Sequence, residues 1–358
     1  MERVLVSGEK YRALVKGRRG LGPALSRLGL RAASVPYGCV VWLRNRLYDR
    51  GGYRIFRANA PVVSVGNLTL GGTGKTPCVE YVTRYFRKQH RRVAILSRGY
   101  GGNAGRNDEA LVLEDNLPDV PHFQGADRVR LASQAVAERV SDVLVLDDGF
   151  QHRRLARDLD LVLIDATDPW GQGYLFPRGL LREPAAELRR ASVVMLTRCN
   201  QVEASERGRL REAITRLAPK APLVESDHRP MELVGLDRAV AGLDRLREQP
   251  VIAFSGIGNP GAFRQTLIDL GANLIGWRTF PDHHRYSGKD VEELRAWADS
   301  QPADCLMATT QKDLVKIRET QWGGKELWAV RIQLHIESGE KEFHQKLDDA
   351  VNGFRSKP

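Results

Sequence analysis

The sequence predicts an α/β protein: a doubly wound parallel sheet with a phosphate-binding loop (P-loop), followed by a second, smaller α/β domain. Short apolar runs rich in Val, Leu and Ile alternate with helix-like segments, as in strands buried on both faces. A glycine-rich turn follows the first run, as in doubly wound folds. A second series of apolar runs begins after Ala218–Gly242, where proline and charge interrupt the periodicity.

The apolar and helical periodicities give the expected elements in order. The strands expected in the first domain are Val62–Val65, Val93–Leu96, Val143–Leu146, Leu161–Ile164 and Val193–Leu196. Its expected helices are Thr76–Gln89, Asp127–Arg139 and Glu206–Leu217. The second domain is expected to hold strands Val251–Phe254, Leu274–Trp277 and Cys305–Thr309, and a helix at Ala262–Leu270.

Residues 61–77 read PVVSVGNLTLGGTGKTP, an apolar strand that leads into a glycine-rich turn and a helix. Glycines allow backbone N–H groups to converge on phosphate oxygens, and the helix directs the positive end of its dipole at the same anion. Lys75 supplies a cation for the outer phosphates, and the Thr76 hydroxyl can ligate Mg²⁺. The residues expected to bind ATP are Gly71, Gly72, Thr73, Gly74, Lys75 and Thr76.

The match to a strict phosphate loop is incomplete, because Thr69 stands where such loops have glycine. An incidental glycine-rich turn is the alternative interpretation. It explains neither the Thr76 that follows the Lys nor the strand that precedes the turn. We therefore expect nucleotide binding.

The strand at Val143–Leu146 ends in two adjacent acids, Asp147 and Asp148. An acid at this position, downstream of a phosphate loop, is the usual second anchor for Mg²⁺. Two neighbouring carboxylates also favour a nearby cation. The alternative is a simple turn at Asp148-Gly149, and the sequence does not say which Asp ligates the metal directly.

The second strand leads into the sequence SRGYGG, and two acids follow shortly afterwards. Ligands of parallel α/β sheets bind beyond the carboxyl ends of the strands, so this loop is expected to start beside the phosphate loop. Arg98 is then a candidate phosphate contact, and Asp108 a candidate base for an attacking hydroxyl. The alternative for Asp108 is a solvated acid of a loop.

Two further motifs lie in the second domain. The sequence FPDHHRY contains Asp282 and His283, a pair that can form a base with a carboxylate partner, although an exposed His-rich loop is equally consistent. The segment Gly256–Gly261 matches GxGxxG after a strand. A dinucleotide site is disfavoured here because the expected acid lies well past the next strand.

The net charge of +11 is concentrated at the N-terminus, where residues 1–60 contain 13 Lys/Arg and three Asp/Glu. Within this arm, Ala32–Leu43 is uncharged but shorter than the roughly 20 apolar residues that span a bilayer. Tyr37, Trp42 and Tyr48 are residue types of membrane interfaces, and arginines follow directly. We expect the arm to contact an anionic membrane surface.

Two other interpretations of the arm stay open. It can be an ordinary helix that packs on the core, with Pro36 and Gly38 marking a break, or a nucleic-acid contact. The second is disfavoured because the aromatics lie in an apolar run rather than among the basic residues. The four cysteines are scattered and no signal peptide is apparent, which is typical of a reducing compartment.

The motifs GNLTLGGTGKTP, SRGYGG, NDE, LDDGFQH, PRGLLREP, SGIGNP, FPDHH and TTQKD occur in this order. Together they resemble the tetraacyldisaccharide 4′-kinase family of lipid A synthesis, from about Val35 to Asp313. The resemblance implies ATP- and Mg²⁺-dependent phosphorylation of the 4′-hydroxyl of a tetraacylated glucosamine disaccharide 1-phosphate. It also implies a peripheral enzyme on the cytoplasmic face of the inner membrane, docked through its N-terminal helix.

The resemblance also assigns residues to roles. Lys75 and Thr76 match the phosphate-loop Lys and Thr, Asp108 the catalytic base, and His283 its partner. Asp147 and Asp148 match the paired strand-end acids. Glu109 and Glu183 match acids near the metal, and Arg182 matches a residue near the substrate phosphate. Asn107 departs from the glycine that usually precedes the base, and Asn tolerates similar backbone angles.

We therefore expect residues 1–60 to form a membrane-contacting arm, 61–225 the nucleotide-binding core, and 226–358 a smaller α/β domain that closes over the active-site cleft. The partners expected are the lipid A disaccharide precursor and the anionic inner-membrane surface, with no nucleic acid and no obligate protein partner. The rival functions are a membrane-associated P-loop ATPase or GTPase switch and a non-catalytic scaffold. The base candidates Asp108 and His283 favour a transferase over both.

Overall fold

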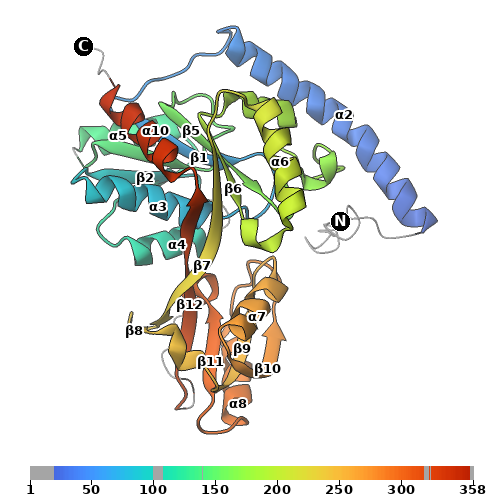
Figure 1. Cartoon of the computed structure of the whole chain (residues 1–358), viewed down its shortest axis with the longest axis vertical. Helices are drawn as coiled ribbons and strands as arrows, with labels where there is room; N and C mark the ends of the chain where they lie inside the picture. The colour runs from blue at the N-terminus through green and yellow to red at the C-terminus, as the bar shows by residue number, and fades with distance from the viewer. Residues whose placement is uncertain (1–19, 100–107, 139, 318–321, 323, 355–358) are drawn as a thin grey trace. The chain divides into compact units, whose positions relative to one another are not determined.

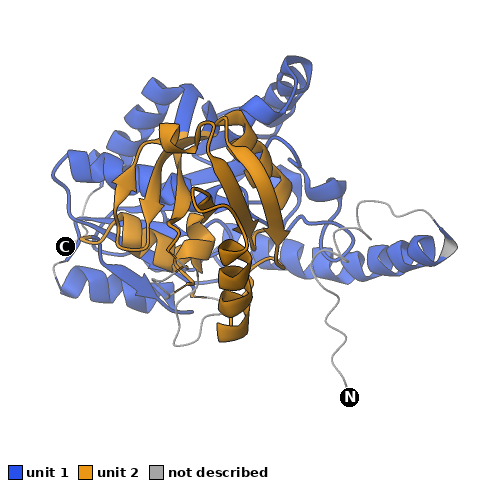
Figure 2. Ribbon diagram, turned by 90° about the horizontal axis from the view of Figure 1, so that it is seen from below, with its two compact units in different colours: residues 1–98, 120–227, 335–358 blue, residues 99–119, 228–334 orange. Residues whose placement is uncertain are grey.

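The computed structural model describes residues 20–99, 108–138, 140–317, 322 and 324–354. The chain forms two compact units, coloured separately in Figure 2. Unit 1 comprises residues 1–98, 120–227 and 335–358, and unit 2 comprises residues 99–119 and 228–334. The expected division was different: the expected arm is counted with unit 1, residues 335–358 return to unit 1, and residues 99–119 belong to unit 2.

Unit 1 contains a parallel sheet with the strand order β7-β6-β5-β1-β4-β2-β3. Its strands are β1 (Val62–Asn67), β2 (Val93–Ser97), β3 (His122–Gln124), β4 (Val143–Asp147), β5 (Leu159–Asp165), β6 (Val193–Thr197) and β7 (Leu223–Gly235). β1 lies between β4 and β5, so the turn that follows β1 leaves from the middle of the sheet. Every strand expected from the sequence is present, and the expected α/β class is confirmed.

Helices cover both faces of this sheet (Figure 1). The helices of unit 1 are α2 (Leu21–Asp49), α3 (Lys75–Lys88), α5 (Arg128–Ala137), α6 (Ala204–Leu217) and α10 (Glu340–Asn352). On one face, Ile164 and Leu196 pack with Leu210 of α6, and Leu146 packs with Ala132 of α5. On the other face, Cys78 of α3 contacts Met195 of β6. Side chains alternate along strands, so both faces of each central strand are buried.

Helix α2 is a single 29-residue helix that contains both Pro36 and Gly38. The helix has no break at these two residues, where the alternative of an ordinary core-packed helix had placed one. None of the helices in the described part of the chain is long and apolar enough to cross a membrane. Residues 1–19 of the basic arm lie outside the described residues.

Unit 2 has the strand order β10-β9-β11-β12-β7, with β8 (Val240–Ala241) antiparallel to β7. Its other strands are β9 (Pro250–Ser255), β10 (Asn273–Thr279), β11 (Leu306–Thr310) and β12 (Leu327–Ser338). Its helices are α4 (Asp108–Asn116), α7 (Pro260–Asp269), α8 (Gly288–Asp299) and the short α9 (Gln311–Leu314). Ile252 and Phe254 pack with α8, whereas Val251 and Ala253 pack with α7, so this sheet is also covered on both faces.

Strand β7 corrects the expectation for Ala218–Gly242, which the sequence analysis described as a break. The strand runs for 13 residues despite Pro230 and several charges, and β7 and β12 each contain residues of both units. Exposed stretches of a strand tolerate charged residues and proline, so such a strand has no continuous apolar run in the sequence.

The return of the chain to unit 1 gives a stability prediction. Phe343 of α10 is fully buried and its ring lies 6.1 Å from that of Tyr81 on α3. We expect Phe343→Ala to lower the free energy of unfolding by roughly 3–5 kcal/mol, measured by urea denaturation. The control is Lys346→Ala at an exposed position of α10, which should change it by less than about 0.5 kcal/mol. Equal effects of the two substitutions would contradict the packing of α10 in unit 1.

Candidate active site

The turn between β1 and α3 has the backbone of a phosphate loop. Gly71 and Gly74 have φ values of 127° and 85°, which L side chains rarely adopt. Gly74 is the N-cap of α3, and the helix begins at Lys75. The backbone conformation therefore requires glycine at two of the expected positions. The N-terminus of α3, whose first N–H groups have no partner within the helix, directly follows the turn.

Side chains from neighbouring strands hold the carbonyl groups of this turn. The Asn67 amide donates to Thr69 O at 2.8 Å and to Thr73 Oγ1 at 3.0 Å. The Thr197 hydroxyl donates to Thr73 O at 3.1 Å, and Arg198 donates to Gly72 O at 2.7 Å. Because the carbonyls are engaged on the protein side, the turn is held in shape for an anion on its N–H side. The sequence analysis did not identify these supporting residues.

Asp148 is the centre of an ion cluster beside the loop. Arg182 Nη1 lies 2.8 Å from both carboxylate oxygens, and Lys75 Nζ lies 3.7 Å from Oδ1. Burial alone would raise the pKa of Asp148, but Lys75 and Arg182 outweigh it and lower the pKa. Asp148 is therefore ionised at neutral pH. The structure brings together three residues that the sequence analysis selected separately.

Asp147 is the last residue of β4 and is paired in register with Val65 of β1. Alternation along β4 directs it to the face covered by α3, and it is close enough to Cys78 to reinforce the raised pKa that burial gives this thiol. Thr76 is buried in the first turn of the same helix. The carboxylate of Asp147 and the hydroxyl of Thr76 are hard oxygen donors of the kind that Mg²⁺ takes in nucleotide sites, so these residues fit that ion.

Two arginines add positive charge near these acids. Arg98 follows β2 directly, as expected. Arg128, at the start of α5, is buried, and its pKa is lowered by burial first and then by the nearby Arg98. Arg128 also interacts electrostatically with Asp147 and Asp148. The sequence analysis missed Arg128, because no motif surrounds it and only the folded chain brings it to the acids.

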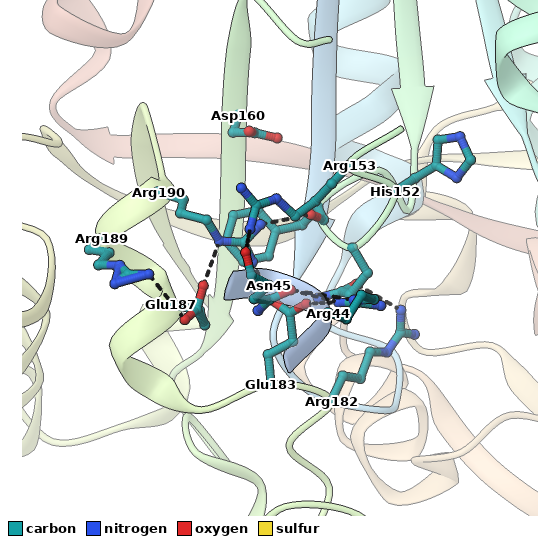
Figure 3. Close-up of polar contacts among 12 residues, drawn as sticks. Arg44, Asn45, His152, Arg153, Asp160, Arg182, Glu183, Glu187, Arg189 and Arg190 are labelled. Atoms are coloured by element: carbon teal, nitrogen blue, oxygen red, sulfur yellow. Dashed lines mark hydrogen bonds and ion pairs between the residues drawn. The ribbon is translucent and has the colours of Figure 1, made fainter. Parts of the chain in front are cut away.

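Glu183, which was expected near the metal, is paired with two arginines instead. Its side chain is 0% exposed, and its two oxygens accept from Arg44 of α2 and from Arg190 (Figure 3). A carboxylate with both oxygens engaged by guanidinium groups is an internal ion-pair acceptor. The structure therefore assigns Glu183 to a cluster with α2, and its neighbour Arg182 to Asp148.

Unit 2 contains the other candidate pair. His283 Nδ1 lies 2.9 Å from Oδ2 of Asp108, the first residue of α4. The Asp108 side chain is only 9% exposed, whereas that of His283 is 61% exposed. Burial alone would raise the pKa of Asp108, but the hydrogen bond from His283 and the charges of Lys312 and His283 lower it to about 2. The same hydrogen bond raises the pKa of His283.

Side chains of helix α9 hydrogen-bond to helix α4, whose first residue is Asp108. Lys312 Nζ lies 2.8 Å from Glu109 Oε1, and Gln311 and Asn116 exchange hydrogen bonds of 2.6 and 3.3 Å. Glu109, an expected metal acid, is thus paired with Lys312 within unit 2. These contacts give the TTQKD sequence a role in positioning α4, which its residue types alone did not indicate.

The GxGxxG segment supports the same pair. Asp313, fully buried, accepts from Gly256 N at 3.0 Å, and Gly256 O accepts from His283 N at 3.2 Å. His283 has a φ of 58°, a conformation that needs such support. Asn259 caps α7 at the other end of the segment. Gly256 therefore links the buried Asp313 to the backbone of His283.

A phosphate loop on a parallel α/β sheet, with acids at the end of the neighbouring strand and an Asp–His pair in unit 2, defines the class of P-loop phosphotransferases. A family model described as tetraacyldisaccharide-1-P 4′-kinase, LpxK, matches residues 26–352. The chain therefore belongs to the tetraacyldisaccharide 4′-kinase family.

Relatives with this name agree over most of the chain. The tetraacyldisaccharide 4′-kinase of Anaeromyxobacter sp. strain Fw109-5 is 43% identical over 329 residues, which cover 86% of this chain and 87% of the relative. That of Syntrophus aciditrophicus strain SB is 38% identical over 355 residues, which cover 90% and 93%. The crystal structure of LpxK from Aquifex aeolicus in complex with ATP aligns with a TM-score of 0.75 and 30% identity, covering 91% of this chain and 99% of that chain.

Family membership confirms the expected kinase of lipid A biosynthesis and disfavours an ATPase or GTPase switch. The individual site residues rest on the geometry described above.

The Asp108–His283 pair gives a pH dependence of stability. The lowered pKa of Asp108 contributes stability that is complete above the unfolded value of about 3.9 and is lost as the pH falls through the folded pKa. The raised pKa of His283 contributes stability that is complete below the unfolded value of about 6.5 and is lost as the pH rises through the folded pKa. Both contributions are complete together only between these two unfolded values.

We therefore expect the loss of unfolding free energy in Asp108→Asn to be greatest between about pH 4 and 6.5 and smaller at pH 8.5. Urea denaturation at pH 5.5 and 8.5 measures it. The control is Asp299→Asn at the exposed end of α8, which should show no such change with pH. A larger loss at pH 8.5 than at pH 5.5 would contradict the pairing.

Proposed function

We propose that the phosphate loop of unit 1 binds Mg·ATP and that Asp108 of unit 2 accepts the proton of the 4′-hydroxyl as the γ-phosphoryl group is transferred to the tetraacylated disaccharide 1-phosphate. The observation that carries this proposal is the Asp108–His283 pair, since an ATPase switch needs no base for a sugar hydroxyl. An enzyme with this base and a phosphate loop is equipped for transfer to an alcohol.

The phosphate-binding role belongs to Gly71–Thr76 and to nearby cations. The backbone N–H groups of the loop and of the first turn of α3 bind phosphate oxygens, and Lys75 offsets charge on the transferring group. Arg98, Arg128 and Arg182 add positive charge near Asp147 and Asp148. This excess of cations over acids suits a polyanion.

Thr76 and Asp147 are the residues of this chain that would hold Mg²⁺, with Asp148 close by and fixed by Arg182. When bound, the ion would offset negative charge on the phosphate oxygens. Glu109 and Glu183 are better suited to other roles, because each is paired with a cation of the protein.

In the proposed transfer step, Asp108 accepts the proton that the hydroxyl releases. The 4′-oxygen forms a bond to the γ-phosphorus, the bond from that phosphorus to the bridging oxygen of ADP breaks, and the hydroxyl proton passes to the Asp108 carboxylate. Asp108 is available for this proton because its pKa of about 2 keeps it ionised at neutral pH. His283 orients the carboxylate through Nδ1, and its exposed ring can pass the proton on to water.

Helix α2 is proposed to dock the enzyme on the cytoplasmic, anionic face of the inner membrane, where an acylated acceptor resides. Leu28, Val35 and Trp42 are exposed and seven residues apart, so they lie along one side of the helix. Ser34 and Tyr37, which hydrogen-bond to the body of unit 1, lie on a different side. Each nearby Lys or Arg adds about 1 kcal/mol of attraction to an anionic surface.

The test of the function is transfer of label from γ-labelled ATP to a tetraacylated disaccharide 1-phosphate in detergent, followed by thin-layer separation. We expect label in the lipid with the wild type and a rate about 10²–10⁴-fold lower with Asp108→Ala. Asp299→Asn should retain the wild-type rate. Label released only as free phosphate, whether or not lipid is present, would overturn the proposal in favour of an ATPase switch.

The test of the membrane role is sedimentation with vesicles that contain phosphatidylglycerol. We expect the triple variant Leu28→Ser/Val35→Ser/Trp42→Ser to bind at least about tenfold more weakly, because apolar burial is lost. A matched triple variant, Met231→Ser/Val240→Ser/Ile268→Ser, removes three exposed apolar side chains of unit 2 and should bind as the wild type does. Equal binding by both variants would count against α2 as the docking element.

A further inference from the structure

Helix α2 is joined to the body of unit 1 by a dense set of polar contacts. Tyr37 Oη donates to Arg182 O at 2.9 Å, and Ser34 Oγ donates to Leu175 O at 3.0 Å. About two helical turns beyond Tyr37, Arg44 donates to the buried Glu183. A helix that served only as a surface anchor would not need hydrogen bonds to two consecutive residues of the core.

The segment that receives these contacts also borders the phosphate loop. Leu70 N donates to Leu180 O at 2.7 Å, and Arg182 N donates to Leu68 O at 2.8 Å. Residues 68–70 lead from β1 into the glycine-rich turn. The segment that α2 contacts at Arg182 is therefore hydrogen-bonded through its backbone to residues 68–70, which directly precede the glycine-rich turn.

The side chains on this segment point to two different partners. Arg182 reaches Asp148 beside Lys75, whereas Glu183 reaches Arg44 and Arg190. Arg190 in turn donates to Phe150 O at 3.4 Å, and its guanidinium lies 4.1 Å from the Phe150 ring. Phe150 is the second residue after Asp148, so the Glu183 cluster contacts the turn that directly follows the acidic pair.

We propose that α2 is a structural part of the nucleotide site, with Arg44 as a positioning residue. Through Glu183, Arg44 fixes the segment 180–183, which sets the position of Arg182 against Asp148 and of Leu68–Leu70 against the loop. This inference rests on the proposed nucleotide site and adds a second role to the helix that docks on the membrane. A buried carboxylate that loses one of its two guanidinium partners is left poorly compensated and shifts its position.

The experiment measures the affinity for Mg²⁺ and a non-hydrolysable ATP analogue by calorimetry, with no lipid or detergent, so that membrane docking has no influence. We expect Arg44→Met to weaken binding about tenfold, Glu183→Gln to weaken it similarly, and the double variant to be no weaker than the worse single variant. Arg209→Met, which removes an exposed arginine of α6, serves as the charge-matched control and should bind as the wild type does.

Tyr37→Phe provides a test that leaves all charges in place. It removes only the hydrogen bond to Arg182 O, and we expect a several-fold loss of affinity with a thermal midpoint lowered by no more than about 2–4 °C. Wild-type affinity in both Arg44→Met and Tyr37→Phe, with a loss in Arg182→Met, would overturn this inference and leave the proposed function intact. Absence of binding by the wild type itself would overturn both.

Discussion

The two adjacent carboxylates at the end of β4 impose the constraint on which unit 1 depends. Asp147 is buried and Asp148 is partly buried, and like charges on adjacent residues are costly unless cations compensate them. Lys75 and Arg182 compensate Asp148 directly, and Arg128 acts on both acids. The surrounding cations exceed the acids, which is the charge balance that a bound polyphosphate with its metal requires. The loop and α3 then supply N–H groups without adding further charge.

The proposed chemical tasks fall on separate sets of residues. The proposed phosphate-binding groups belong to unit 1, whereas the proposed base and its supports belong to unit 2. In unit 2, Asp313 fixes Gly256, Gly256 fixes His283, and Lys312 holds the start of α4. Each support acts through a neighbouring backbone group or side chain. We therefore expect that the proposed proton acceptor can be changed without disturbing the phosphate loop.

Local sequence patterns were sufficient to predict the elements whose chemistry is local. The strand, glycine turn and Lys75-Thr76 are contiguous, and Asp147 and Asp148 directly end an apolar strand, so both were found. The boundaries of most strands differed from expectation by one or two residues, as in Pro250–Ser255 against the expected Val251–Phe254. Helices also shifted slightly because their caps, such as Asp127 for α5, lie outside the apolar pattern.

Features that depend on long-range contacts were not predictable. Glu183 was expected near the metal, but its partner Arg44 lies 139 residues away in the sequence, and only the folded chain shows the pairing. Lys312 reaches Glu109 across 203 residues, and Arg128 carries no motif at all. Strand β7 was hidden because its charges and proline do not resemble the buried strands of the same sheet. In each case the residue types are ordinary and the tertiary partner defines the role.

The most direct test of this division of tasks compares two variants that should fail for different reasons. The dissociation constant for Mg²⁺ and a non-hydrolysable ATP analogue is measured for Lys75→Met and for Asp108→Asn, without acceptor. We expect Lys75→Met to lose at least about tenfold in nucleotide affinity, whereas Asp108→Asn should bind as the wild type does. Equal losses in the two variants, or a loss confined to Asp108→Asn, would contradict the assignment of nucleotide binding to unit 1 and of the base to unit 2.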